Sequence, residues 1–173
     1  MKTGKVLISI FGTILLFAII LLVTGPSKVF MKRSITIHSP VDSVYNTLNN
    51  IKKFNSWSPW YEMDPHAKYS FEGPDSGAGA KMVWESVEMG SGAIWIVDIE
   101  KDKKVDMEMD FGYGGETHAL FLLKPLNEGT SVTWTYEEKP GLVARMMYHF
   151  IDLNAVLAPD YEQGLKNLKK IME

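Results

Sequence analysis

An uncharged apolar segment near the N-terminus places the strongest constraint on what this chain can fold into. Val6 to Thr24 (VLISIFGTILLFAIILLVT) spans nineteen residues without a charge, and about 20 apolar residues cross the hydrocarbon core of a bilayer. Three interpretations compete: a retained transmembrane helix, a cleaved signal peptide, and a buried helix of a soluble core. The segment is longer than the roughly 7 to 15 residues of a signal-peptide core, and residues 24–27 lack an A-x-A-like cleavage site. A retained anchor is therefore expected.

The residues after this segment predict the end of the helix and a short tether. Gly25-Pro26 should stop the helix, because proline lacks a backbone donor and restricts the residue before it. We expect an anchor and tether over residues 1–28 and one folded domain over residues 29–173. Basic residues flank the apolar segment on both sides, so the positive-inside rule leaves the side of the membrane open. They are Lys2, Lys5, Lys28, Lys32 and Arg33.

Composition narrows the classes of function. A hydrophobic content of 46% suits a chain with a buried core rather than a disordered one. The formal charge of -3 at pH 7 argues against nucleic acid as a partner. The chain has no cysteine, which excludes disulfides, cysteine-ligated zinc, iron–sulfur clusters and thiol catalysis. No cofactor is expected, and protein partners and oligomeric state stay open.

Beyond the tether, the hydrophobic period predicts a strand followed by short helices. Residues 29–39 alternate apolar and polar side chains, as a half-buried strand does. A short helix should run from Pro40 to about Asn50, because Ser39 suits an N-cap and proline suits the first helical position. Residues 51–65 are dense in Trp, Asn, Ser and Pro and predict a second short helix that breaks into a loop.

Six further segments predict strands, and turn-rich connections of hairpin length make them an antiparallel meander. They are residues 68–73, 80–86, 91–100, 104–113, 117–126 and 130–138. The clearest alternation is VDMEMDF, which places Val105, Met107, Met109 and Phe111 on one face and Asp106, Glu108 and Asp110 on the other. The same logic assigns Trp84, Trp95, Phe121, Leu123, Val132, Trp134 and Tyr136 to an inner face.

The C-terminal third predicts two helices, over residues 142–157 and 158–173, divided at Pro159. In the second helix an apolar stripe should cover the inner face of the sheet. It consists of Tyr161, Leu165, Leu168 and Met172. In the first helix the spacing of Arg145, His149 and Asp152 predicts polar pairing on the surface.

This order of elements is that of the α+β helix-grip fold, in which a curved antiparallel sheet of about seven strands wraps around a long C-terminal helix. The stretches FNSWSPW (54–60), YSFEGPDSGAGAKMVWES (69–86), GTSVTWTYE (129–137) and APDYEQGLKNLK (158–169) resemble the polyketide cyclase/dehydrase branch of the SRPBCC, or START-like, superfamily. The resemblance covers about residues 30–173, and the N-terminal helix resembles that of membrane-attached bacterial members. It implies the fold and a cavity. It specifies no activity, because the family includes lipid carriers, ligand sensors and cyclases.

The inner face predicts an apolar pocket for a hydrophobic or amphipathic small molecule, such as a lipid or a polyketide-like compound. The expected ligand-binding residues are Trp57, Trp60, Trp84, Trp95, Met107, Met109, Phe111, Phe121, Trp134 and Tyr161. The alternative is that these side chains simply fill a core. Trp57 and Trp60 would be either a gate at the cavity entrance or a structural plug, and Tyr161 with the C-terminal helix would close the cavity.

Signals for catalysis and for metal binding are weak, so we assign no catalytic residue and no metal ligand. The histidines at 38, 66, 118 and 149 form no local ligand motif. The carboxylates at 106, 108 and 110 fit a solvated sheet surface better than a cation site. The glycine-rich residues 73–81 lack the Gly-Lys-Ser/Thr ending of a phosphate loop and predict a hairpin turn.

Two other functions stay open. A cyclase or dehydratase would need polar groups inside the pocket, and the candidates are Tyr69, Glu85, Tyr113 and Tyr136. A non-catalytic sensor or interaction module would be favoured by an exposed apolar patch. The candidate patch comprises Met146, Met147, Tyr148 and Phe150.

Overall fold

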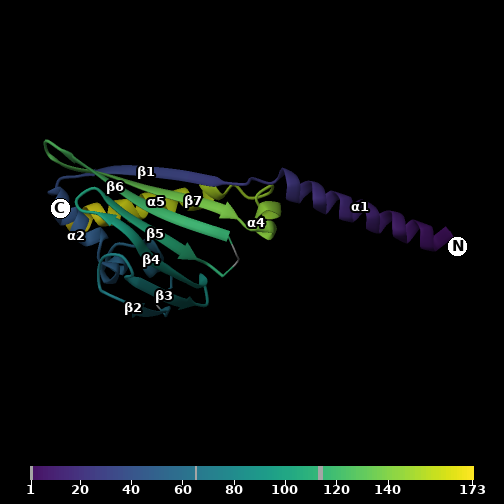
Figure 1. Cartoon of the computed structure of the whole chain (residues 1–173), viewed down its shortest axis with the longest axis horizontal. Helices are drawn as coiled ribbons and strands as arrows, with labels where there is room; N and C mark the ends of the chain where they lie inside the picture. Colours follow the sequence, from purple (N-terminus) through teal and green to yellow (C-terminus); the bar gives the residue numbers. More distant parts are fainter. Residues whose placement is uncertain (1, 65, 113–114) are drawn as a thin grey trace.

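The computed structural model describes residues 2–64, 66–112 and 115–173. One antiparallel sheet with the strand order β1-β7-β6-β5-β4-β3-β2 curves around a C-terminal helix (Figure 1). The strands are β1 (Val29–Ile37), β2 (Lys68–Glu72), β3 (Lys81–Ser86), β4 (Gly90–Glu100), β5 (Lys104–Asp110), β6 (Gly115–Leu126) and β7 (Gly129–Pro140). The helices are α1 (Lys2–Thr24), α2 (Val41–Leu48), the 3-10 helix η1 (Ile51–Ser56), α3 (Pro59–Met63), α4 (Leu142–Met147) and α5 (Leu153–Met172). The predicted helix-grip fold is confirmed.

Side-chain burial follows the predicted alternation in β5, β6 and β7. Val105, Met107 and Met109 are buried, and their neighbours in β5 are more exposed. Trp134 in β7 and Phe121 in β6 are almost completely buried as well. The inner face predicted for these strands is therefore confirmed.

Trp95 of β4 lies on the outer face of the sheet, not on the inner face as predicted. Its cross-strand partners are Lys81 and Glu108, while its neighbours Ile94 and Ile96 are the buried residues of β4. The placement of Trp95 on the inner face was wrong. The cause is the run AIWIV, which is apolar at consecutive positions and so carries no alternation from which to choose a face.

The short helices after β1 and the C-terminal helices end at other positions than predicted. The second short helix is divided into η1 and α3, and Asn50 caps η1 by accepting from Lys52 N at 3.0 Å. The C-terminal break lies after α4, where the Asp152 side chain caps α5 by accepting from Asn154 N at 3.0 Å. The division at Pro159 was wrong, since this proline lies inside α5. Packing of the buried stripe holds α5 together across a residue that costs roughly 3 kcal/mol in a helix interior.

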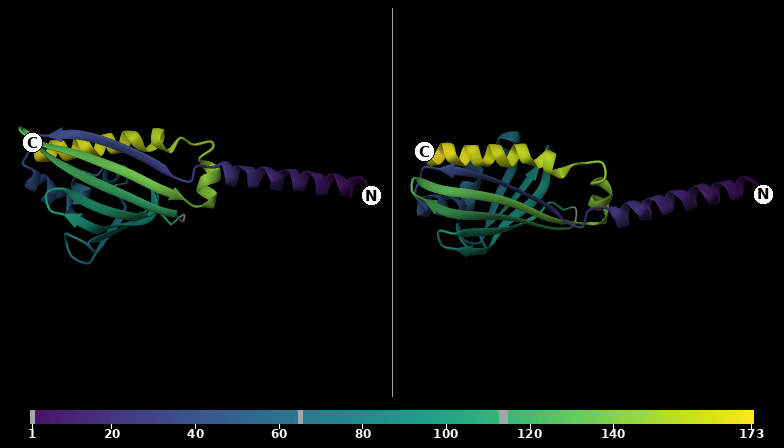
Figure 2. Two further views of the ribbon diagram at one scale, coloured as in Figure 1. Left: turned by 45° about the horizontal axis from the view of Figure 1, so that its top comes forward. Right: turned by 90° about the horizontal axis from the view of Figure 1, so that it is seen from above.

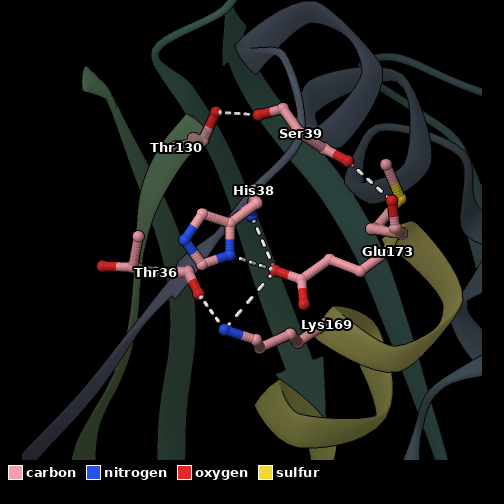
Figure 3. A network of polar contacts seen from close by, with 7 residues as sticks. Thr36, His38, Ser39, Thr130, Lys169 and Glu173 are labelled. Carbon is pink, nitrogen blue, oxygen red and sulfur yellow. Dashed lines mark hydrogen bonds and ion pairs between the residues drawn. The ribbon is translucent and has the colours of Figure 1, made fainter. Parts of the chain in front are cut away.

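Polar contacts fasten the C-terminal end of α5 to the end of β1 (Figure 3). Glu173 Oε1 accepts from the backbone N–H of His38 at 2.7 Å, and Lys169 Nζ donates to Thr36 O at 2.9 Å. The Ser39 hydroxyl donates to Met172 O at 2.6 Å. These contacts, here called the C-terminal latch, hold α5 along β1.

Helix α1 lies outside the folded body. It leads away from the end of the sheet opposite the C-terminus (Figure 2). Gly4–Thr24 has a mean hydropathy of 3.1 and none of its most apolar window is buried, so it is no core helix. Its length and composition are sufficient to cross a membrane, a property that a signal sequence shares.

Candidate functional site

A cavity of about 270 Å³ lies between the short helices η1 and α3 and the inner face of strands β3 to β5. This volume lies just below the range for small-molecule pockets, which starts at about 300 Å³. Most of its lining side chains are aromatic, aliphatic or methionine. The lining residues are Phe54, Asn55, Ser58, Trp60, Tyr69, Met82, Trp84, Met89, Ile94, Met109 and Phe111.

The cavity has a buried floor and a more exposed rim. Met82, Ile94 and Met109 on three neighbouring strands are buried and form the floor. Trp84 is half-buried and Phe111 is exposed, and their ring centroids lie 5.8 Å apart at the rim. Methionine side chains on the floor can repack around ligands of different shape.

The polar groups of the lining are few and uncharged. Among the described lining residues they are Asn55, Ser58, Tyr69 and the indole N–H groups of Trp60 and Trp84, and none is a carboxylate, a histidine, a lysine or an arginine. Burial, with a smaller contribution from the charge of Asp64, raises the pKa of Tyr69. Tyr69 therefore stays a neutral hydrogen-bonding group near pH 7.

A buried carboxylate orders the rim. Asp64, which is 6% exposed, accepts from the Ser86 hydroxyl at 2.6 Å and from the His66 N–H at 2.9 Å. The hydrogen bond from Ser86 is the main cause that lowers the pKa of Asp64. Ser86 Oγ in turn accepts from Met89 N at 2.9 Å. This chain of hydrogen bonds holds the β3–β4 turn, which carries Met89, against the end of α3. This role of Asp64 was not predicted from the sequence.

The ten predicted ligand-binding residues fall into three groups. Trp60, Trp84, Met109 and Phe111 line the cavity. Trp57, Met107, Phe121, Trp134 and Tyr161 are buried in the core and do not line it. Trp95 lies on the outer face of the sheet. A role in ligand binding stays a prediction for the first group.

The two members of the Trp57/Trp60 pair occupy different environments. Trp57 is buried, with ring centroids 5.4 Å from Trp134 and 5.8 Å from Phe121, so it acts as a structural plug. Trp60 is half-buried at the rim, stacked 6.3 Å from Phe54. Tyr161 lies 4.0 Å from Trp134 and fills the core instead of closing the cavity. Helix α5 therefore covers the part of the sheet beside the cavity and does not close the cavity itself.

The predicted ligand-binding residues left out seven of the lining residues: Phe54, Asn55, Ser58, Tyr69, Met82, Met89 and Ile94. Tyr69 was considered only as a candidate for catalysis, and Met82 is the buried residue of β3. Ile94 belongs to the same ambiguous run as Trp95. The other four lie in helices or turns, where no strand alternation assigns a face. The position of Phe54 and Ser58 next to the Trp57/Trp60 pair was the one available signal.

The acid–base candidates do not converge in the cavity. Tyr136 donates to Glu138 Oε2 at 2.9 Å, and Tyr148 donates to the same buried carboxylate at 3.0 Å. Burial is the main cause that raises the pKa of both tyrosines. Glu85 is exposed and its neighbour Trp84 points inward. Tyr113 lies outside the described residues.

The acidic row of β5 belongs to the outer face, as predicted. Asp106 Oδ2 lies 3.8 Å from Lys104 Nζ, and Glu108 Oε1 lies 4.0 Å from His118 Nδ1. In the described part of the chain, no group of three or more acidic or histidine residues is placed to hold a metal ion.

Comparison with known proteins identifies relatives of this architecture. Residues 29–173 match the family described as "Polyketide cyclase / dehydrase and lipid transport". A search of curated protein sequences found no match.

Solved structures with the same fold share little sequence with the chain. Protein CV1439 from Chromobacterium violaceum is 18% identical, with a TM-score of 0.59 over 86% of this chain and 99% of that one. The Aha1 dimer from Colwellia psychrerythraea is 16% identical, with a TM-score of 0.59 over 84% of this chain and 96% of that one. Truncated norcoclaurine synthase from Thalictrum flavum is 13% identical, with a TM-score of 0.59 over 83% and 92%. At these identities the likeness establishes the fold alone.

Proposed function

Since the chain belongs to the polyketide cyclase/dehydrase and lipid transport family, we propose that it is a membrane-anchored protein that binds a hydrophobic or amphipathic small molecule. The ligand, a lipid or a polyketide-like compound, occupies the cavity beneath Trp60 and Trp84. Residues 1–28 serve as anchor and tether, and residues 29–173 form the binding domain.

The cavity lining carries this proposal. Its floor is made of Met82, Ile94 and Met109, and its described polar groups are all neutral. Such a site gains binding free energy mainly from burial of apolar ligand surface, about 25 cal/mol per Å². Its described lining residues offer no charged group that would select an ion or a sugar phosphate.

Helix α1 supports the membrane part of the proposal. Gly4–Thr24 is long enough to cross a bilayer and exposes its apolar side chains to the surroundings. Exposed apolar side chains along a whole helix are unfavourable in water and favourable in lipid. The anchor would keep the cavity close to a store of apolar ligands.

Native mass spectrometry tests the binding proposal. The full chain is purified in detergent from its own host, and bound compounds are released by organic extraction and identified. We expect an apolar compound near one equivalent per chain. Repeated recovery of empty protein that takes up no added lipid or polyphenol would refute ligand binding.

A pair of tryptophan variants locates the ligand. Trp84 lines the cavity, and Trp95 is a half-buried tryptophan on the adjacent strand that faces the other way. We expect Trp84→Ala to lose most of the bound compound and Trp95→Ala to keep it. Equal retention by both variants would place the ligand elsewhere.

The cyclase or dehydratase alternative rests on Tyr69, the one phenol among the described lining residues. Its hydroxyl can donate a hydrogen bond to a substrate carbonyl. Its raised pKa makes the phenolate, the form that would act as a general base, scarce near pH 7. Turnover of an identified ligand by the wild-type chain, abolished in Tyr69→Phe, would favour the enzyme. Unchanged ligand after prolonged incubation would favour carriage.

A further inference from the structure

We propose that α4 and the residues after it, up to Ile151, form a surface that docks the domain onto the lipid bilayer. This surface, here called the docking surface, consists of Leu142, Val143, Met147, Phe150 and Ile151. The proposal rests on the membrane-spanning role proposed for α1.

The docking surface consists of large apolar side chains that are exposed. Phe150 is 76% exposed and Val143 is 70% exposed, and each of the other members is exposed as well. Five large apolar side chains within ten residues exceed the scattered apolar residues of an ordinary protein surface. The exposed patch that the sequence analysis associated with an interaction module is therefore present, although Met146 and Tyr148 are only half-exposed.

Contacts with α1 fix the position of this surface. Arg145 Nη2 donates to Gly25 O at 3.1 Å, and His149 Nε2 lies 2.9 Å from Leu21 O. A Cβ at Gly25 would lie 2.4 Å from the carbonyl oxygen of Arg145, so the two segments are in close contact at a residue without a side chain. The predicted pairing of Arg145, His149 and Asp152 was wrong, because the first two bind the end of α1 and the third caps α5.

A second contact joins the segment after α4 to the sheet. Tyr148 donates to both oxygens of the buried Glu138 at 3.0 Å, which ties the segment after α4 to the end of β7. The segment is thus held on one side by the sheet and on another by α1. Its apolar side chains are left on the outside.

The length of α1 places the docking surface at the membrane boundary. At 1.5 Å per residue, Gly4–Thr24 spans about 31 Å, close to the roughly 30 Å of a hydrocarbon core. Thr24 then lies at the edge of the core, and a segment in contact with Leu21 and Gly25 lies at the same level. The occupant of the surface is therefore the bilayer, which the anchor brings there without any other partner.

The same edge of the sheet carries the rim of the cavity. Strands β3, β5 and β7 end at this edge, and β1, β4 and β6 begin there, because all neighbours are antiparallel. Helix α1 leads away from this edge (Figures 1 and 2). Met89 follows β3 and Phe111 follows β5, so both rim residues belong to this edge. Docking through α4 turns the cavity mouth toward the bilayer. The ligand class is then an apolar compound dissolved in the membrane.

Spin labelling of the full chain in phospholipid vesicles tests the docking surface. The chain has no cysteine, so one introduced cysteine gives one nitroxide. The test variants are Phe150→Cys and Val143→Cys. Leu126→Cys, at the opposite end of the sheet, is the water-exposed control, and Ile14→Cys in α1 reports on the anchor. Collision with oxygen and with a water-soluble nickel complex measures the depth of each label.

We expect labels at 143 and 150 to lie about 5 to 10 Å below the level of the headgroups, as in interfacial helices. The label at 14 should be lipid-exposed and the label at 126 water-exposed. If position 14 is in lipid while 143 and 150 contact water, the anchor stands and the docking surface is refuted. If position 14 contacts water, the anchor and the docking surface both fail.

Two further outcomes separate the bilayer from a protein occupant. Spin–spin broadening at position 150 that disappears on dilution with unlabelled chain would assign the surface to a second copy and overturn the proposal. Depth at 143 and 150 without broadening, retained in vesicles that contain no other protein, supports the bilayer. Each labelled variant is accepted only if its circular dichroism matches the unlabelled chain.

Discussion

The two halves of the inner face of the sheet are made from the same kinds of side chain, but one half is a filled core and the other borders a cavity. Under β6 and β7, Trp134 packs against Tyr161 of α5, and the rings of Phe121 and Trp57 pack against Trp134 and each other. The ring centroids of these pairs lie 4.0 to 5.8 Å apart, and the space is filled. Under β3 to β5 the methionines and Trp84 border a cavity. Composition alone therefore does not distinguish a core from a pocket.

The difference follows from what covers each half. Helix α5 lies along β1, and its side chains reach β7. The far strands are covered by α2, η1 and α3, short helices of 8, 6 and 5 residues, whereas α5 has 20 residues. A sheet wider than the helix that packs on it leaves apolar surface uncovered unless a ligand fills the space.

The largest expected effect is on the filled half. Trp134 is 1% exposed, so Trp134→Ala should lower the free energy of unfolding by about 3 to 5 kcal/mol. Trp84→Ala should lower it by only about 1 kcal/mol, because half-exposed Trp84 borders empty space. Denaturant titration of the full chain in detergent measures both values. Equal losses would show that the two halves are packed alike.

A smaller effect comes from adding volume to each half. A Cβ at Gly164 would lie 2.9 Å from a Trp134 ring carbon and 3.2 Å from Pro59 Cδ. Gly164→Ala should therefore lose about 1 kcal/mol net, since overpacking by about 1 to 3 kcal/mol outweighs the helix preference of alanine. Ile94→Phe places its extra atoms in the cavity and should change stability by less than that while reducing ligand occupancy. Thermal unfolding with and without ligand compares the two.

The smallest expected effect is at the C-terminal latch. The hydrogen bond from the backbone N–H of His38 is the main cause that lowers the pKa of Glu173 below its ordinary value of 4.5. A carboxyl with a lowered folded pKa stabilises the fold above its unfolded pKa, and this contribution is lost as the pH falls through the folded pKa. Unfolding of Glu173→Gln and wild type should differ slightly at pH 7 and converge at acid pH. A constant difference at all pH values would contradict a role for the charge.

The parts of the fold that were predictable carry strong periodic patterns. The alternation of VDMEMDF fixed which residues of β5 point inward, and turn residues between strands fixed their antiparallel order. The face on which Trp95 lies could not be predicted from alternation, because both faces of AIWIV are apolar. Its face depends on pairing with Lys81 and Glu108, which only the assembled sheet defines.

The apolar nature of the candidate site could be predicted from the sequence, but the identity of its lining residues could be predicted only in part. Strand alternation identified inward-facing Trp84 and Met109, but it could not separate them from Trp134, which faces the same way. That separation depends on where α5 lies across the sheet. The end of α4 was also missed, since the contacts of Arg145 and His149 with α1 join residues far apart in sequence.

The pairing of β1 with β7 gives the sheet a defined order of assembly. Every other strand pair joins neighbours in the sequence, whereas Val29 pairs with Glu138 and Ile37 with Thr130. Contacts between distant residues form late, because the loop between them must close first. During synthesis β1 therefore has no strand to pair with until β7 has left the ribosome.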